Sequence, residues 1–396
     1  KVGPMSVMKP LSERMTDIDS YYEGILLPSK AIEGRAVSAV LHEFRDLGGL
    51  RLRSESSTWL HMKKSTNSGA PFFTKRRAVF VDTVPFELED NYQYLGTGNT
   101  RYGAPAILGW RGQEGGEDVD EVKQRVVWMF PLAVNIAELT CYQPFIEAAQ
   151  RKNVVPAWVS MDAVDERITA MFDTKAEDDL VVCTDFSKFD QHFNESLQNV
   201  AYTVLDNLLS NGSDSQYWLG VVFPIKYSIP LAYNWGKVRF GRHGMGSGSG
   251  GTNCDETIAH RALQYEAAIK QGAKLNPNSQ CLGDDGVLTY PGITVEDVTR
   301  AYTSHGLDMN PDKQYASRQD CVYLRRWHHK DYRESGVCVG VYSTCRALGR
   351  LRYLERYQDP KFWGPKAVAL RQLSIIENCK WHPLREEFVQ FCMKRD

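Results

Sequence analysis

The sequence predicts an α+β fold in which helices back an antiparallel sheet, and three stretches of the chain carry this prediction. Residues 180–184 form an apolar run with the length of a buried strand, and short β-prone runs flank a Gly-Asp-Asp-Gly turn at 283–286. Between them, residues 254–269 place apolar side chains at helical spacing, and Gly272 is a helix stop. These stretches predict a strand and a hairpin that belong to one sheet, and a helix that packs against this sheet.

The hairpin at 281–290 presents two adjacent carboxylates, Asp284 and Asp285, at its tight turn. Two acids at a turn tip repel each other unless a cation lies between them. Magnesium prefers oxygen ligands, and a further carboxylate would allow two ions to clamp a phosphoryl transfer. A solvated turn is the alternative, because Asp and Gly are common turn residues.

The further carboxylate is Asp185, which directly follows the apolar run at 180–184. An acid at the end of a buried strand can lie beside the hairpin turn of the neighbouring strands. Asp185 could instead cap the element that follows it. Because Asp185 and Asp284 both stand at the end of an apolar β run, we expect them to bind metal together.

A glycine-rich loop at 244–251 precedes the predicted helix and can bring backbone close to a phosphate or a sugar. Gly246, Gly248 and Gly251 also satisfy the dinucleotide-binding fingerprint, but the chain about 20 residues on is still helical instead of forming a second strand. The Gly-Lys-Ser/Thr ending of a Walker phosphate loop is missing. Asn253 and Glu256 fit a reciprocal capping pattern at the helix start.

At these positions the chain resembles the viral RNA-dependent RNA polymerases. The order and approximate spacing of their motifs A, B and C occur as Asp185-x4-Asp190, Ser247-Gly248-x3-Thr252 and Gly283-Asp284-Asp285. Further stretches resemble motifs G, F, D and E, at residues 66–71, 123–125, 306–313 and 323–327. The amino-acid sequence at 185–194 and 247–253 is most similar to that of polymerases from picobirnaviruses, which are double-stranded RNA viruses. Partitivirus-like enzymes are the neighbouring group.

The resemblance implies a catalytic site for template-directed RNA synthesis from ribonucleoside triphosphates. It assigns two Mg²⁺ ions, with Mn²⁺ as an alternative, to Asp185 and Asp284, and Asp285 assists from the side. Lys123 and Arg125 would neutralise the triphosphate. Lys313 would protonate the leaving pyrophosphate, although Asn310 to Lys313 is also a good solvated turn.

Recognition of the sugar and of the nucleotide is implied for the motif A and motif B residues Asp190, Ser247, Gly248, Thr252 and Asn253. Many relatives have an Asn four residues after the motif B Thr, whereas here that position is Glu256. The third sugar contact therefore lies open between Asn253 and Glu256.

RNA contacts are implied for five residues in motifs G and E: Thr66, Gly69, Pro71, Arg325 and Arg326. Basic residues also cluster at 63–64, 75–77 and 123–125, and in a late set of Arg346, Arg350, Arg352 and Arg356. One such cluster is usually a solvated face, but several in a near-neutral chain suggest a basic tunnel for RNA.

The resemblance implies a right-hand polymerase with fingers, palm and thumb. The predicted boundaries are fingers at 1–141, palm with motif A at 142–225, a fingers insertion at 226–243, palm with motifs B to E at 244–331, and a thumb at 332–396. The chain begins with Lys1 and its relatives usually carry longer ends, so we expect a fragment with an incomplete thumb.

Composition is compatible with this class. The net charge is only −2, and nine scattered cysteines without a CxxC pair argue against a disulfide framework or a zinc site. Neither a signal peptide nor a transmembrane run is visible, so we expect the virion interior or the host cytoplasm, with the viral capsid protein as a further partner. A reverse transcriptase, a dinucleotide-binding enzyme and a two-metal nuclease are the alternatives.

Overall fold

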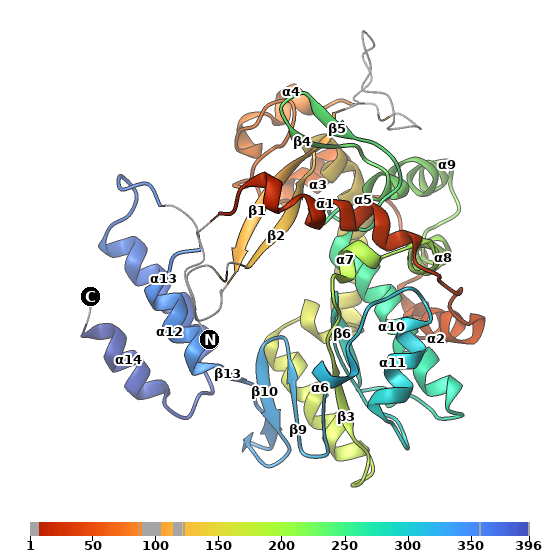
Figure 1. Ribbon diagram of the computed structural model, residues 1–396, viewed down its shortest axis with the longest axis vertical. Helices are drawn as coiled ribbons and strands as arrows, with labels where there is room; N and C mark the ends of the chain where they lie inside the picture. Colours follow the sequence, from red (N-terminus) through yellow and green to blue (C-terminus); the bar gives the residue numbers. More distant parts are fainter. Residues whose placement is uncertain are drawn as a thin grey trace.

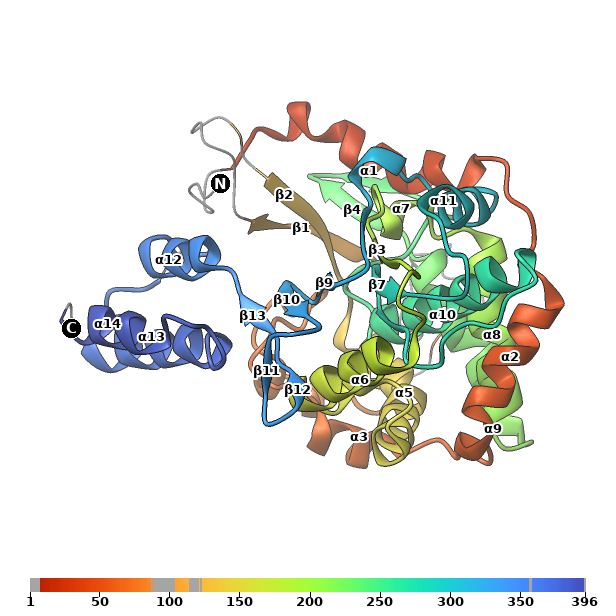
Figure 2. The same cartoon turned by 90° about the horizontal axis from the view of Figure 1, so that it is seen from below.

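The computed structural model of the chain describes residues 8–86, 88, 104–113, 121, 123–355 and 358–394. The body combines helices with two four-stranded sheets. Three helices near the C-terminal end, α12 (Thr344–Arg352), α13 (Pro365–Asn378) and α14 (Arg385–Met393), lie to one side of the body (Figures 1 and 2). The predicted α+β class is confirmed.

One antiparallel sheet contains both the predicted buried strand and the predicted hairpin. Its strand order is β6 (Gln280–Leu282), β7 (Asp285–Leu288), β3 (Val181–Thr184) and β8 (Tyr315–Ser317). Strand β7 lies beside β3, with Thr184 opposite Gly286. The expected position of the hairpin next to the strand that ends before Asp185 is therefore confirmed.

The two faces of this sheet pack against different helices, because successive side chains of a strand point to opposite faces. Val182 belongs to the large core that includes Ile258 of α10 (Thr252–Lys270). Val181 and Cys183 pack instead with side chains of α6 (Met161–Thr174). The sheet thus lies between α10 and α6.

A second sheet lies in the upper half of Figure 1 and has the order β2 (Lys123–Met129), β1 (Ala106–Gln113), β4 (Leu231–Asn234) and β5 (Lys237–Arg239). Strands β1 and β2 are antiparallel, whereas β4 runs parallel to β1. The strand-like stretch before the glycine loop therefore joins a sheet that begins much earlier in the chain.

Long helices fill the core between the sheets. Helix α5 (Leu132–Lys152) is mostly buried, and α2 (Gly34–Phe44) and α8 (Glu195–Leu208) pack against α10. The shorter helices are α1 (Met15–Glu23), α3 (Glu55–His61), α4 (Phe80–Thr83), α7 (Phe189–His192), α9 (Ser213–Tyr217) and α11 (Val295–Thr303). Within the described ranges, no helix combines the length and the apolar composition that a membrane crossing requires.

The start of α10 corrects one prediction. The helix begins at Thr252, one residue before the predicted cap Asn253, and its N-cap residue is Gly251, without a side-chain capping bond. The reciprocal capping pattern of Asn253 and Glu256 is therefore wrong, because both residues already lie inside the helix. The predicted stop is confirmed, since α10 ends at Lys270 and Gly272 has φ of 65°.

A smaller sheet leads from the body to the C-terminal helices. It consists of β13 (Val341–Tyr342), β10 (Arg326–His329) and β9 (Asp320–Tyr323), and a hairpin of β11 (Arg333–Glu334) and β12 (Val337–Cys338) extends from it. Beyond it, Ala347, Ile375 and Cys379 form a small separate core.

Candidate active site

Two acidic side chains meet where β3 ends and where the β6–β7 hairpin turns. Asp185 directly follows β3, and Asp284 is the second residue of the two-residue turn between Leu282 and Asp285. Burial and the neighbouring Asp284 carboxylate raise the pKa of Asp185, whereas the Lys313 ammonium group lowers it. The structure thus brings Asp185, Asp284 and Lys313 into one electrostatic site.

Helix α10 holds the turn that carries Asp284. Gly283 has φ of 59°, a conformation that glycine adopts without steric cost. Its amide donates to Thr257 Oγ1 at 2.9 Å, and its carbonyl accepts from His260 Nδ1 at 2.8 Å. Burial lowers the pKa of His260 to about 4, so the ring is neutral and its proton is on Nδ1. Both polar groups of the Gly283 backbone are therefore fixed by one helix.

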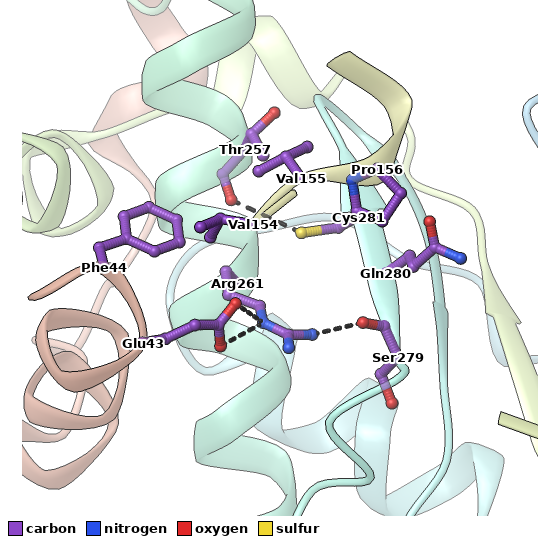
Figure 3. A pocket seen from close by; sticks show the side chains of 10 residues that line it. All are labelled: Glu43, Phe44, Val154, Val155, Pro156, Thr257, Arg261, Ser279, Gln280 and Cys281. Carbon is purple, nitrogen blue, oxygen red and sulfur yellow. Dashed lines mark hydrogen bonds and ion pairs between the residues drawn. The ribbon is translucent and has the colours of Figure 1, made fainter. Parts of the chain in front are cut away.

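Arg261 of α10 stabilises the same hairpin by binding the backbone just before β6 (Figure 3). Its Nε donates to both Glu43 oxygens at 3.2 and 3.1 Å, and its Nη1 donates to the Ser279 carbonyl at 2.7 Å. The cavity beside it is about 20 Å³, which is enough for about one water molecule. Arg261 thus connects α2 and α10 to the start of the hairpin that carries Asp284, beside a cavity too small for a substrate.

Asp285 is directed toward a second hairpin turn. Its Oδ2 accepts from the Leu324 amide at 2.8 Å. Burial raises the pKa of Asp285 to about 7, although the Leu324 amide and Arg325 oppose this shift. In the described part of the chain, no group of three or more Asp, Glu, His or Cys side chains is arranged to hold a metal ion. Asp185, Asp284 and Asp285 nevertheless all line one cavity.

Gln314 is a site residue that sequence reasoning missed. The Asp185 amide donates to Gln314 Oε1 at 2.7 Å, and Gln314 Nε2 donates to the Asp185 carbonyl at 2.9 Å. This pair of bonds fixes the backbone that carries the Asp185 carboxylate. The only available signal was the position of Gln314 directly after the predicted Lys313.

Two cavities share Arg125 and Asp284 as lining residues. One of about 230 Å³ is lined by Arg125, Asp190 and Asp284 among others. The other, of about 460 Å³, is lined by Arg125, Asp185, Asp284 and Arg325 among others. Lys123 is exposed and lies two residues before Arg125 on β2, so both side chains point to the same face of the strand.

Asp190 and Glu256 form a carboxyl pair beside the smaller cavity. Their side chains are hydrogen-bonded to each other, which requires a shared proton. Glu256 is only 5% exposed, and burial together with Asp190 raises its pKa well above the usual range. We therefore assign the proton to Glu256, which makes it a donor toward Asp190.

Asn253 is oriented differently from Glu256. Asn253 is exposed, and its Oδ1 accepts from Trp158 Nε1 at 2.7 Å. Of the two candidates for the third sugar contact, Glu256 is the one that the structure joins to Asp190.

The glycine loop packs tightly against the protein itself. A Cβ on Gly248 would lie 1.6 Å from the Trp128 carbonyl oxygen, and one on Gly251 would lie 2.4 Å from the Tyr142 ring. These two glycines are therefore required by contacts with β2 and α5. Approach of the backbone to a phosphate is not needed to explain them.

Hydroxyl and carboxyl groups then hold the loop in place. Ser247 Oγ donates to the Val126 carbonyl at 3.2 Å, and Thr252 Oγ1 donates to the Gly246 carbonyl at 3.2 Å. Glu138 accepts from the Gly250 amide at 3.1 Å and also bonds the Ser249 hydroxyl. Ser247 and Thr252 thus lie at the two ends of a fixed loop.

Comparison with known proteins decides the family. A sequence model of the family described as "Viral RNA-dependent RNA polymerase" matches residues 54–340. The chain is 62% identical over 398 residues to a protein of Human picobirnavirus (strain Human/Thailand/Hy005102/-) described as a "Potential RNA-dependent RNA polymerase", and the match covers 100% of this chain and 74% of that protein. The chain belongs to the viral RNA-dependent RNA polymerases.

Crystal structures agree with this assignment. The RNA-dependent RNA polymerase of a human picobirnavirus superimposes with a TM-score of 0.95 at 62% identity, covering 100% of this chain and 76% of that one. An insertion loop deletion mutant of such a polymerase gives a TM-score of 0.94 at 62% identity, covering 100% of this chain and 78% of that one. The polymerase fold and the resemblance to picobirnaviruses are confirmed.

The polymerase is thus a nucleotidyltransferase that uses an RNA template and nucleoside triphosphates. The dinucleotide-binding alternative fails, because the sheet beside the glycine loop helix is antiparallel and no strand follows within the expected distance. The reverse transcriptase and nuclease alternatives fail because the matched family copies RNA from RNA.

The motif G residues for which RNA contacts are predicted lie in a loop that packs on the end of β2. A Cβ on Gly69 would lie 2.5 Å from the Phe130 carbonyl oxygen, and Gly69 has φ of 64°. Thr66 is half-buried and Pro71 is exposed. The structure places Pro71 at the surface and leaves Gly69 a structural role.

The two motif E arginines have different environments. Arg325 lies at the β9–β10 turn and lines the larger cavity. Arg326 is 8% exposed, and its two terminal nitrogens donate to the two Asp165 oxygens at 2.7 and 2.9 Å. The expected contact of Arg326 with RNA does not fit this burial, because its charge is already paired inside the protein.

The arginines of the late basic set also differ in their environments. Arg346 lines the larger cavity, whereas Arg350 pairs with Glu355 at 3.1 Å. Arg352 stacks over the Tyr353 ring with 5.4 Å to its centroid. Arg356 lies outside the described residues.

Proposed function

We propose that the polymerase extends RNA with two Mg²⁺ ions, or Mn²⁺ as an alternative, held by Asp185 and Asp284. The observation that carries this proposal is that these two carboxylates interact electrostatically and both line the larger cavity. Magnesium commonly binds one or two protein carboxylates and completes its shell with water and substrate phosphates, so this donor set fits the ion. When bound, the ions would supply positive charge to the phosphoryl transfer and lower the pKa of the attacking 3′-hydroxyl.

The basic residues supply charge and a proton in this proposal. Arg125 lines both cavities, so its guanidinium group is placed to bind a triphosphate that spans them. Lys123 assists from the same face of β2. Lys313 acts as the proton donor to pyrophosphate, which is supported by its electrostatic contact with Asp185.

Sugar recognition involves the carboxyl pair. Asp190 accepts the ribose 2′-hydroxyl, and the protonated Glu256 holds the Asp190 carboxylate in place from the other side. Thr252 and Ser247 belong to the same sugar site. Glu256 therefore takes the place that Asn has in many relatives.

The RNA strands occupy the outer parts of the site. Arg325 contacts the nascent strand from the larger cavity, and Thr66 and Pro71 face the template. We infer replication and transcription of a viral double-stranded RNA genome, in the virion interior or the host cytoplasm and in contact with capsid protein. The similarity to picobirnavirus polymerases supports this inference.

The division into fingers, palm and thumb is part of the same proposal. Strands β4 and β5 join the sheet of β1 and β2, which supports assigning residues 226–243 to the fingers. The sheet with Asp185 and Asp284 is the palm, and the C-terminal helices are the thumb.

Asp185→Asn and Asp284→Asn test the metal assignment. Each removes one charge at nearly constant volume, so incorporation of labelled ribonucleotides on an RNA template with Mg²⁺ should fall at least about a hundredfold. Asp206→Asn, an exposed acid on α8, is the control and should retain wild-type activity. Thermal unfolding should show all three variants folded. Incorporation within a few-fold of wild type in either catalytic variant would remove that residue from the metal site.

A further inference from the structure

Gln314 stands where the backbone pairing between β3 and β8 ends. At this end of the two strands, the last pair is Cys183 opposite Tyr315. Beyond it the Gln314 side chain takes over, because its Oε1 accepts from the Asp185 amide at 2.7 Å and its Nε2 donates to the Asp185 carbonyl at 2.9 Å. The side chain thus binds both polar groups of the Asp185 backbone, as a neighbouring strand would.

The same amide group also binds the turn that carries Lys313. Gln314 Nε2 donates to the Asn310 carbonyl at 2.9 Å, and the Lys313 backbone amide donates to that carbonyl at 3.0 Å. A Gln amide nitrogen has two protons and a carbonyl oxygen has two lone pairs, so each group can make both of its bonds. A single acceptor, the Asn310 carbonyl, therefore connects Gln314 with the Lys313 backbone.

Further bonds hold this turn in place. Lys313 ends a short 3₁₀ helix, η8 (Pro311–Lys313), and the Asn310 side chain caps its start. In the same segment, the Asp308 carbonyl accepts from the Ser187 amide at 2.9 Å. The segment with Lys313 is therefore attached at two points to the segment that follows β3.

The side chains of Asp185 and Lys313 are both exposed, so packing in the interior does not fix them. Their relative position depends instead on how their backbones are joined. Gln314 is half-buried and binds both sides of this junction.

We propose that Gln314 is a positioning residue that sets the separation between the Asp185 carboxylate and the Lys313 ammonium group during nucleotide incorporation. A misplacement of about 1 Å can cost about a hundredfold in rate, so the side chain that joins the two backbones controls the chemical step. Gln314 does not touch the reacting atoms, and its effect is transmitted through the two residues that it joins. The inference rests on the proposed role of Lys313 as proton donor.

Gln319, on the turn between β8 and β9, provides a matched control. It is exposed, and its bonds run through its backbone, since its amide donates to Ser317 Oγ at 3.1 Å and its carbonyl accepts from the Lys330 amide at 2.8 Å. Gln314→Met and Gln319→Met remove the same amide group from two side chains of the same length. Only the first change breaks the proposed connection.

The test measures single-turnover incorporation of a ribonucleotide by the full chain at several nucleotide concentrations, which separates the maximal rate from nucleotide affinity. In Gln314→Met the maximal rate should fall roughly ten- to a hundredfold, and the apparent Kd should change by less than about threefold. Gln314→Glu is nearly isosteric and keeps an acceptor for the Asp185 amide, but it loses both donated bonds, so its maximal rate should also fall. Gln319→Met should match wild type.

A double-mutant cycle with Lys313→Met tests how the effect is transmitted. Because Gln314→Met acts partly through Lys313, its fold-loss in the Lys313→Met background should be at least about threefold smaller than in wild type. Thermal unfolding shows which variants are folded, and Gln314→Glu carries the test if Gln314→Met is not. Four outcomes would overturn the inference: a wild-type rate in the Gln314 variants, an equal loss in Gln319→Met, a loss of affinity without a loss of rate, or additive losses in the cycle.

Failure of the proposed function is read from other variants. A wild-type maximal rate in Lys313→Met would remove the proton donor, and Gln314 would then have none to position. The metal assignment is tested independently by Asp185→Asn and Asp284→Asn, because the Gln314 variants keep both acids.

Discussion

The burial of side chains in helices α10 and α13 is the reverse of what their polarity would suggest. In α13, only Ile375 is buried, and Leu370 and Leu373 are 67% and 61% exposed. In α10, most of the helix is buried, including these polar and charged residues: Asp255, Glu256, Thr257, His260, Arg261, Gln264 and Glu266. Burial follows the place of each helix in the fold, since α10 is surrounded by α2, α8 and the catalytic sheet, and α13 lies at one side (Figure 2).

The buried polar groups of α10 are tolerated because they have partners. Asp255 accepts from the Tyr142 and Tyr227 hydroxyls at 2.7 and 2.6 Å and pairs with Lys226 at 3.0 Å. A buried charge without such partners would cost several kcal/mol. The comparison of the two helices shows that a polar helix in the interior of a fold can be a structural support for a site, as α10 is for the turn that carries Asp284.

The largest contrast is expected for arginines in the two helices. Arg261→Met in α10 leaves the Glu43 carboxylate without its counter-charge and the Ser279 carbonyl without the Arg261 donor, so the free energy of unfolding should fall by about 3–5 kcal/mol. Arg371→Met in α13 removes bonds to the Leu351 and Tyr353 carbonyls in a partly exposed place and should cost about 1 kcal/mol. Urea unfolding measures both values, and equal losses would contradict the comparison.

A pH effect of intermediate size should come from buried histidines of the framework. Burial lowers the pKa of His243 and of His260 to about 4, whereas both titrate near 6.5 when unfolded. The unfolded chain therefore binds these protons first, so stability is complete above about pH 6.5 and falls toward pH 4, by about 3 kcal/mol for each residue.

His260→Asn tests the predicted loss of stability toward low pH, because the Asn amide can still donate to the Gly283 carbonyl but does not titrate. Its unfolding free energy should decline less steeply between pH 6.5 and 4 than that of wild type. Helix α13 contains no histidine and should contribute nothing to this slope. Parallel curves for wild type and His260→Asn would refute the assignment.

The smallest effect is expected for the exposed leucines of α13. Leu370→Gln and Leu373→Gln should each change the free energy of unfolding by no more than about 0.5 kcal/mol, because little apolar surface is lost from the interior. Ile258→Ala in α10 is the matched comparison and should cost about 2–5 kcal/mol. A loss above about 1 kcal/mol at either leucine, measured by urea unfolding, would show that this face of α13 is covered in solution.

Local patterns were sufficient where the relevant contacts run between neighbouring strands. Of the apolar positions that the helical spacing places on one side, Ile258, Ala262 and Leu263 are fully buried, and Ile269 is half-buried. Asp185 and Asp284 could be brought together because both stand at strand ends in a short, regular sheet.

Side-chain partners that lie in distant elements could not be predicted from local sequence patterns. The burial of Arg326 depends on Asp165 in α6, and the role of Gln314 depends on the Asp185 backbone. Tyr21 lines the 230 Å³ cavity although it lies near the N-terminal end of the chain. No periodicity or spacing encodes such pairings, because each partner lies in a separate element.

The bond between the Leu324 amide and Asp285 makes the two hairpin turns mutually dependent. Leu324 and Arg325 have φ of 52° and 61°, a conformation that costs non-glycine residues roughly 1–2 kcal/mol each. Such a turn keeps its shape only while its surroundings hold it, and Asp285 is one of the groups that do so. The distance between Asp284 and Arg325 therefore depends on the Asp285 carboxylate, which belongs to one hairpin and binds the other, so a distortion of either turn would displace both.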